Sequence, residues 1–124
     1  MDGAEAEQSR KVLIVEDDVL SYTGLKRLLE HYGCEVDHAG TVADGIKQLE
    51  GEPEFVFLDL MLPDGEGTRV LERVRMGNMA SRVIVVSGIT EPGMLWRVKA
   101  LQPEAMLQKP VDFLKILELM KPAA

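Results

Sequence analysis

Apolar and polar positions along the chain alternate between two kinds of segment. Short continuous apolar runs, rich in β-branched residues, occur at Lys11–Val15, Glu54–Leu58 and Arg82–Val86. Such runs are typical of strands that are buried on both faces, as in a parallel sheet. Weaker runs at Glu35–Ala39 and Ala105–Gln108 complete a set of five predicted strands, and the polar alternation in the first of these favours an edge strand.

Segments with helical spacing of apolar residues follow each of these runs. We therefore expect five helices, with Thr41 and Asp112 as N-caps of the second and the fifth. The residues expected to face the core are Leu25, Leu28, Leu29 and Tyr32; Val42, Ile46 and Leu49; Val70, Leu71 and Val74; Leu95, Val98 and Leu101; and Phe113, Ile116, Leu117 and Met120.

This order of elements predicts a doubly wound α/β domain. Strands joined by helical crossovers pair in parallel through right-handed connections, and the helices cover both faces of the resulting sheet. Functional groups in such sheets gather beyond the carboxyl ends of the strands. Candidate chemistry is therefore sought in the residues that directly follow each strand.

Composition and charge narrow the classes of protein that fit. With 124 residues the chain has the length of one domain, and residues 1–9 are expected to be a disordered leader to a domain over 10–124. The net charge of −7 argues against direct nucleic acid binding. One cysteine excludes an internal disulfide and suggests a cytoplasmic protein, and no stretch approaches the roughly 20 apolar residues of a membrane span.

The predicted strand ends carry a set of acids, a hydroxyl and an ammonium. Glu16 and Asp17 end the first strand and Asp59 the third, while Ser87 ends the fourth and Lys109 the fifth. Clustered carboxylates repel one another unless a cation sits among them, and carboxylate oxygens are ligands that Mg²⁺ prefers. Metal, ammonium and hydroxyl would share the charge of a phosphoryl group being transferred to an aspartate.

Four segments resemble the receiver domain of two-component response regulators. They are KVLIVEDD at 11–18, FVFLDLMLPDGEG at 55–67, VIVVSG at 83–88 and Lys109-Pro110, and the resemblance covers residues 10–121. It implies a flavodoxin-like sheet of five strands in the order 2-1-3-4-5 with five helices. It also implies a domain that catalyses its own phosphorylation and dephosphorylation without being a free-standing enzyme.

The resemblance assigns a role to each strand-end residue. Asp59 would be the phosphoacceptor, and Ser87 and Lys109 would contact the phosphoryl group, with a cis peptide before Pro110. Mg²⁺ would be held by Asp17, Asp59 and the Met61 backbone carbonyl, with Glu16 acting through water. The phosphoryl donor would be a sensor histidine kinase or a phosphotransfer protein.

The chain departs from the family pattern around the predicted fifth strand. Met106 stands where an aromatic residue is usual, so the resemblance does not extend to the residue that, in the family, couples phosphorylation to a surface change. We expect a downstream protein or output domain to bind the surface of the fourth helix, fifth strand and fifth helix through Met94, Trp96 and Met106. The residues also leave open that Trp96 folds back onto the domain.

Three further questions stay open at this stage. A receiver fold that works mainly by docking, with weak or no coupling to phosphorylation, is the alternative function. A haloacid-dehalogenase type phosphatase is disfavoured because Met61 stands where its second aspartate would be. The sequence does not decide between a stand-alone receiver and part of a longer regulator.

His31 and His38 have no partner motif and are predicted to be surface residues.

Overall fold

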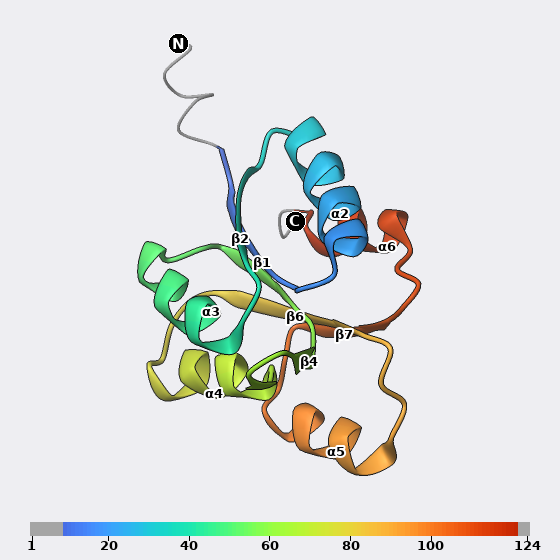
Figure 1. Ribbon diagram of the computed structural model, residues 1–124. Helices are drawn as coiled ribbons and strands as arrows, with labels where there is room; N and C mark the ends of the chain where they lie inside the picture. Colours follow the sequence, from blue (N-terminus) through green and yellow to red (C-terminus); the bar gives the residue numbers. More distant parts are fainter. Residues whose placement is uncertain (1–8, 122–124) are drawn as a thin grey trace.

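A computed structural model describes residues 9–121 of the 124-residue chain. The predicted leader therefore lies, apart from Ser9, outside the described residues. One parallel sheet runs through the domain in the order β2-β1-β3-β6-β7, which is the predicted 2-1-3-4-5 order (Figure 1). Its strands are β1 (Lys11–Val15), β2 (Glu35–Ala39), β3 (Phe55–Leu58), β6 (Arg82–Ser87) and β7 (Ala105–Gln108).

Helices cover both faces of this sheet, as predicted. Two of them pack on one face and three on the other (Figure 1). The first pair is α2 (Val19–His31) and α6 (Phe113–Leu119); the others are α3 (Val42–Gln48), α4 (Thr68–Met76) and α5 (Pro92–Ala100). A short 3-10 turn, η1 (Leu49–Gly51), extends α3.

Side-chain caps start four of the helices close to the strand ends, with Glu91 as the cap of α5. Asp18 accepts a hydrogen bond from the Ser21 amide at 2.9 Å, directly after β1. Thr41 and Asp112 cap α3 and α6 in the same way, as the sequence predicts. Each cap satisfies an amide that has no partner inside its helix, so the turns between strands and helices are short and well defined.

The central strands are buried on both sides and divide the core in two. In β1, Leu13 and Val15 belong to the core under α3, α4 and α5, whereas Val12 and Ile14 belong to the core under α2 and α6. This is the alternation that a pleated strand imposes on its side chains. Because helices cover both faces of the sheet, polar side chains can gather at the carboxyl ends of its strands.

Three helix faces differ from the prediction. In α5 the buried residues are Met94 and Val98, and Leu95 is half-buried. The interior accepts one stripe of this helix, and an i, i+4 pair defines it. Tyr32 is exposed because it is the C-cap of α2, beyond its last full turn. Phe113, expected in the core, is partly exposed at the first turn of α6.

A small hairpin not predicted from the sequence follows β3. Its strands, β4 (Met61–Leu62) and β5 (Gly65–Glu66), pair antiparallel. The chain then returns so close to the sheet that a Cβ on Gly67 would lie 1.9 Å from the Asp59 carbonyl oxygen. A glycine is therefore required at this point, and the Gly67 amide donates to the Leu60 carbonyl at 2.8 Å.

Within residues 9–121, every helix falls short of the length and apolar character needed to cross a bilayer.

Candidate functional site

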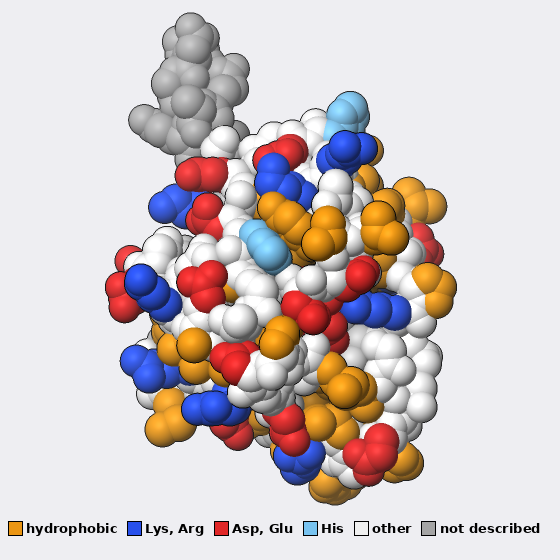
Figure 2. Space-filling model, viewed as in Figure 1, with side chains coloured by type: hydrophobic (Ala, Val, Ile, Leu, Met, Phe, Trp, Pro, Cys, Tyr) orange, Lys and Arg blue, Asp and Glu red, His pale blue; other side chains and the backbone are white. Residues whose placement is uncertain are grey.

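Three carboxylates meet at the carboxyl end of the sheet. Glu16 and Asp17 follow β1 and Asp59 follows the neighbouring strand β3, and oxygens of all three lie within 4.8 Å of one another. Asp59 is only 8% exposed and Glu16 is also buried, whereas Asp17 is exposed. Figure 2 shows acidic side chains gathered on this face with hydrophobic side chains around them. The predicted convergence of these acids is thus present in the structure.

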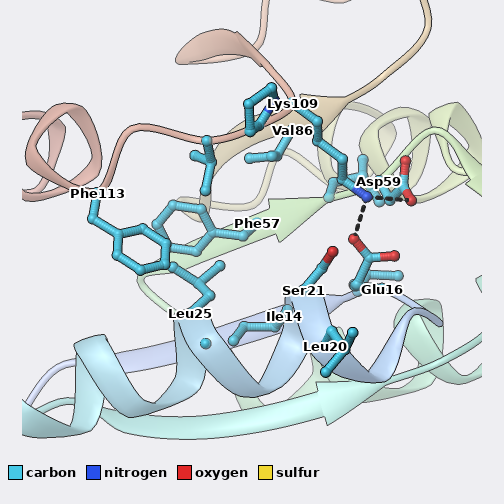
Figure 3. Close-up of a pocket in the computed structure, with 15 residues that line it drawn as sticks. Ile14, Glu16, Leu20, Ser21, Leu25, Phe57, Asp59, Val86, Lys109 and Phe113 are labelled. Atoms are coloured by element: carbon cyan, nitrogen blue, oxygen red, sulfur yellow. Dashed lines mark hydrogen bonds and ion pairs between the residues drawn. The ribbon is translucent and has the colours of Figure 1, made fainter.

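Lys109 reaches into this cluster from the end of β7. Its Nζ donates to Glu16 Oε1 at 2.6 Å and to Asp59 Oδ2 at 3.2 Å (Figure 3). The peptide bond between Lys109 and Pro110 is cis, as the resemblance implied. One ammonium therefore bridges carboxylates from two strands that are not adjacent to its own.

Burial and charge shift the ionisation of the cluster. Burial raises the pKa of Glu16, and the charge of Asp59 acts in the same direction, while the Lys109 bond opposes them. Burial alone would lower the pKa of Lys109, but the bond to Glu16 and the charge of Asp59 outweigh it, so its net shift is upward. Three carboxylates thus share one ammonium among the described residues, which leaves an excess of negative charge.

Ser87 occupies the strand end between Asp59 and Lys109. It is the last residue of β6, is buried, and its carbonyl accepts a hydrogen bond from the Lys109 amide at 3.0 Å. Its hydroxyl oxygen accepts from the Ile89 amide at 3.2 Å and keeps its own proton to donate. Sheet order therefore places this hydroxyl at the end of β6, the strand next to β3, and its contact with a phosphoryl group stays a prediction.

Met61 lies directly beside the acidic cluster. Its amide donates to Asp59 Oδ1 at 3.4 Å, and its side chain is exposed. The carboxylate of Asp59 is consequently held toward the start of the β4–β5 hairpin. The metal-binding role expected of the Met61 carbonyl is not tested by these contacts and stays a prediction.

His38 is a neighbour of the site that the sequence did not reveal. It is half-buried instead of lying free on the surface, and its ring stacks on Tyr22 with centroids 3.7 Å apart. Its Nε2 lies 2.6 Å from the Glu16 carbonyl oxygen. A polar residue at the end of an edge strand beside the acidic segment was the available signal, but no spacing motif accompanies it.

Asp64 lies at the turn of the hairpin and supports the site from outside. Its carboxylate accepts hydrogen bonds from the Val42 and Ala43 amides, at 2.7 and 3.1 Å. These bonds lower the pKa of Asp64. The hairpin that follows Asp59 is thereby tied to the first turn of α3, which agrees with a turn and capping role instead of a metal-binding one.

An apolar cavity of about 560 Å³ adjoins the acidic cluster, with Glu16, Asp59 and Lys109 at one end. Ile14 and Phe57 are among the residues that line it from the sheet (Figure 3). The cavity opens between α2 and α6, where Leu20 and Phe113 line it. A partner that reaches Asp59 from this side meets apolar surface next to charge.

The exposure expected of the predicted partner surface is found for one of its residues and contradicted for another, and the interface itself stays a prediction. Trp96 is 76% exposed on α5, so it does not fold back onto the domain. Met94 is only 9% exposed and packs in the core, so it cannot contact a partner. Met106 is half-buried against that core. A helix buries only one stripe, and Met94 takes a place on it that leaves Trp96 on the opposite side.

Comparisons with known proteins agree with this architecture and its site. Residues 12–121 match the model of the response regulator receiver domain. The acid tolerance regulatory protein ActR of Rhizobium meliloti is 33% identical over 104 residues, which cover 83% of this chain and 54% of that protein. RegA of Rhodobacter capsulatus, a photosynthetic apparatus regulatory protein, is 34% identical over 86 residues, covering 68% of this chain and 47% of RegA.

A solved structure shows the same fold. The CheY-like receiver domain from Methanospirillum hungatei has a TM-score of 0.82 and 29% identity, with 90% of each chain covered. The chain spans about half the length of the curated regulators named above. The matched segment includes all of the sheet except Lys11 at the start of β1, and it contains all the residues of the acidic cluster with Lys109. The chain therefore belongs to the response regulator receiver domain family of two-component signalling systems.

Proposed function

We propose that this domain accepts a phosphoryl group on Asp59 from a phosphohistidine of a sensor histidine kinase or phosphotransfer protein. The observation that carries the proposal is the Lys109 ammonium, which bridges Glu16 and Asp59 inside a cluster with excess negative charge. A structural ion pair needs only one carboxylate for one ammonium. The surplus acids are explained by a positively charged species that joins them when the site is in use.

The transfer follows from the positions of the side chains. An Asp59 carboxylate oxygen attacks phosphorus, a new O–P bond forms, and the N–P bond to the donor histidine breaks with the electron pair leaving on nitrogen. Lys109 stays beside the carboxylate and offsets the charge of the phosphoryl oxygens. The Ser87 hydroxyl supplies a further donor from the adjacent strand end.

The acidic cluster has the donor set of a divalent cation site. We assign Asp17, Asp59 and the Met61 carbonyl as ligands of Mg²⁺, with Glu16 acting through water, because hard oxygen donors suit this ion. When bound, Mg²⁺ would supply positive charge next to the phosphoryl oxygens. A similar fold, a response regulator from Burkholderia pseudomallei with 21% identity, TM-score 0.80 and 91% of this chain covered, is described with a phosphorylated aspartic acid and a calcium ion.

The phosphodonor protein is proposed to dock beside the apolar cavity. The first turns of α2 and α6 expose Val19, Leu20 and Leu114 next to the site, and Leu20 is 84% exposed. Exposed apolar side chains around a charged centre are typical of interaction surfaces. A phosphohistidine presented on a helical partner could thus reach Asp59 while its neighbours cover these side chains.

Output is proposed to pass through the surface of α5, β7 and α6, with Trp96 as the exposed anchor on α5 and Met106 as a half-buried residue of β7. Met94 is excluded from this surface by its burial. The docking alternative shares this surface but predicts equal partner affinity with and without phosphorylation. A cytoplasmic location stays a prediction from the single cysteine.

Phosphoryl uptake tests the proposal directly. The parent protein is incubated with Mg²⁺ and acetyl phosphate, and its intact mass is measured alongside that of Asp59→Asn. We expect the parent to gain one phosphoryl group and Asp59→Asn to gain none. Asp37→Asn, which changes an exposed acid on β2, is the matched control and should behave as the parent.

Two outcomes would count against this function. Equal uptake by parent and Asp59→Asn would show that another residue is modified. Uptake on Asp59, combined with an unchanged affinity for a cognate partner in the presence of the mimic beryllium fluoride, would favour the docking alternative.

A further inference from the structure

His38 contacts the acidic segment from two directions. It lies opposite Ile14 in the β1–β2 pairing, one residue before the end of β2. From there its ring nitrogen reaches the Glu16 carbonyl oxygen at 2.6 Å, and its ring face lies on Tyr22 at a centroid distance of 3.7 Å and an interplanar angle of 22°. Glu16 is the first residue of the 16–18 loop that leads to α2, and Tyr22 lies in the first turn of that helix, so one side chain contacts both ends of the connection.

The chemistry of this contact defines the state of the imidazole. A backbone carbonyl oxygen only accepts hydrogen bonds, so Nε2 of His38 must carry a proton and donate it to Glu16. This bond satisfies a carbonyl at the end of β1, beyond the last residue of the β1–β2 ladder. The stack on Tyr22 fixes the plane of the ring and therefore the direction in which Nε2–H points.

His38 is itself held in place by its own main chain. Gln48 Nε2 donates to the His38 carbonyl at 2.7 Å and to Asp44 Oδ2 at 3.0 Å. The Glu16 amide also donates to the Ala39 carbonyl at 2.9 Å, which closes the pairing of β1 with the end of β2. Both main-chain polar groups of Glu16, its amide and its carbonyl, are thus hydrogen-bonded to residues of the edge strand β2.

These hydrogen bonds to the Glu16 main chain matter because charge repulsion within the acidic cluster acts against the observed position of the loop. Glu16, Asp17 and Asp59 repel one another when no cation lies among them, and this repulsion favours outward movement of the short loop over 16–18. The Asp18 amide donates to Glu16 Oε2 at 3.1 Å, so the position of the Glu16 carboxylate and the path of the loop are linked. A contact that fixes the Glu16 main chain therefore restricts both the position of its carboxylate and the path of the loop.

We infer that His38 is a positioning residue that holds the 16–18 loop in the geometry needed for cation binding before the cation arrives. This inference rests on the proposed function, because it assumes that the acidic cluster takes up Mg²⁺. Preorganisation by outer contacts is a general feature of metal sites, where such contacts orient the groups that touch the ion. His38 acts here through the main chain of Glu16 and not through contact with the ion.

The test separates the hydrogen bond from the stack with three variants. His38→Gln keeps an N–H donor, His38→Phe keeps a ring for Tyr22 but has no donor, and His38→Ala has neither. Mg²⁺ alone is titrated calorimetrically into each protein. We expect His38→Ala and His38→Phe to bind Mg²⁺ about ten-fold more weakly than the parent, with His38→Gln restoring most of the affinity.

A second readout needs no metal. In metal-free protein, exchange of the Asp18 amide hydrogen reports its bond to Glu16 Oε2. We expect faster exchange at Asp18 in His38→Ala and His38→Phe than their change in global stability accounts for. Val36→Ala, a truncation at a half-buried position two residues earlier on β2, is the matched control. It should lower global stability without changing Mg²⁺ affinity or local exchange at Asp18.

The outcomes separate this inference from the proposed function. Mg²⁺ affinity within about two-fold of the parent in His38→Ala, together with unchanged Asp18 exchange, would overturn the positioning role. An equal loss in Val36→Ala would also overturn it, because the effect would then be general destabilisation. If the parent itself bound no Mg²⁺, the proposed function would fail, while the exchange at Asp18 would still decide whether His38 braces the loop.

Discussion

The two ends of the sheet both carry charged clusters, but their charges are balanced differently. At the amino end, Arg10 pairs with Glu54 at 2.7 Å and Arg82 pairs with Glu104 at 2.8 Å. Both guanidinium groups also lie over the Phe55 ring, at 4.9 and 4.7 Å from its centroid. Each of these two acids has its own basic partner, whereas at the carboxyl end three acids share Lys109.

This difference distinguishes a structural cluster from a functional one. Pairwise neutralisation, with an aromatic ring between the two cations, makes the amino end stable without any added species. The carboxyl end keeps a charge that its own side chains do not cancel. Only the second arrangement gains from binding a cation or reacting with a phosphoryl group.

The largest effect is expected from Gly67→Ala. The new Cβ would stand 1.9 Å from the Asp59 carbonyl oxygen, so the backbone that carries Asp59 must move. We expect a loss of about 3 kcal/mol or more in the free energy of unfolding, measured by urea denaturation, together with weaker Mg²⁺ binding. Gly51→Ala, where a Cβ has open space, should be nearly neutral. Equal stability of the two variants would contradict the close approach at the carboxyl end.

A smaller effect, with opposite signs at the two ends, is expected when one acid is neutralised. In metal-free buffer Asp17→Asn should raise the free energy of unfolding by about 0.5 kcal/mol, because it relieves repulsion among the clustered acids. Glu54→Gln should lower it by about the same amount, because it removes the partner of Arg10. Chelator-treated protein and urea denaturation provide the measurement. A shift of the same sign in both variants would remove the contrast between the ends.

The smallest effect is the dependence of stability on pH. The hydrogen bond from Arg10 lowers the pKa of Glu54 below its usual 4.5, and the bond from Arg82 does the same for the pKa of Glu104. Stabilisation from these pairs is therefore present above pH 4.5 and is lost as the pH falls through the lowered folded-state values. Each exposed pair should contribute less than about 0.5 kcal/mol.

The carboxyl end should show the opposite pH sign. Burial raises the pKa of Glu16, so stability of the metal-free protein should fall as the pH rises from 4.5 through its higher folded-state value. Urea denaturation across this pH range, in parent, Glu54→Gln and Glu16→Gln, separates the two contributions. As the pH falls below 4.5, the free energy of unfolding of Glu54→Gln should decrease less than that of the parent. As the pH rises above 4.5, the free energy of unfolding of Glu16→Gln should not decrease in the way expected of the parent. Superimposable curves for all three proteins would argue against both assignments.

The sequence predicted the fold and the acidic cluster because both depend on local pattern and strand order. Apolar runs ending in Glu16, Asp59 and Ser87 define strands whose carboxyl ends must meet at one edge once they are parallel. The ammonium of Lys109 could be added because its strand belongs to the same sheet. The roles of these residues came from the family resemblance and not from the pattern.

Features that depend on tertiary contacts were not predictable in this way. His38 has as partners a backbone carbonyl and the ring of Tyr22, sixteen positions earlier in the sequence, and neither leaves a spacing motif. The orientation of α5 was ambiguous because Met94, Leu95 and Trp96 are consecutive and any of them could have faced the core. Packing against the sheet decided this choice.

The orientation of α5 has a practical consequence for watching this domain at work. Trp96 is the chain's sole tryptophan and its indole lies largely in water, so intrinsic fluorescence of the unlabelled protein reports on the polarity around one known point. Any protein that covers the outer side of α5 will shift that emission to shorter wavelength, whereas a ligand confined to the far side of the sheet will leave its colour unchanged. The molecule thus carries a built-in optical probe on the helix through which its signal is proposed to leave.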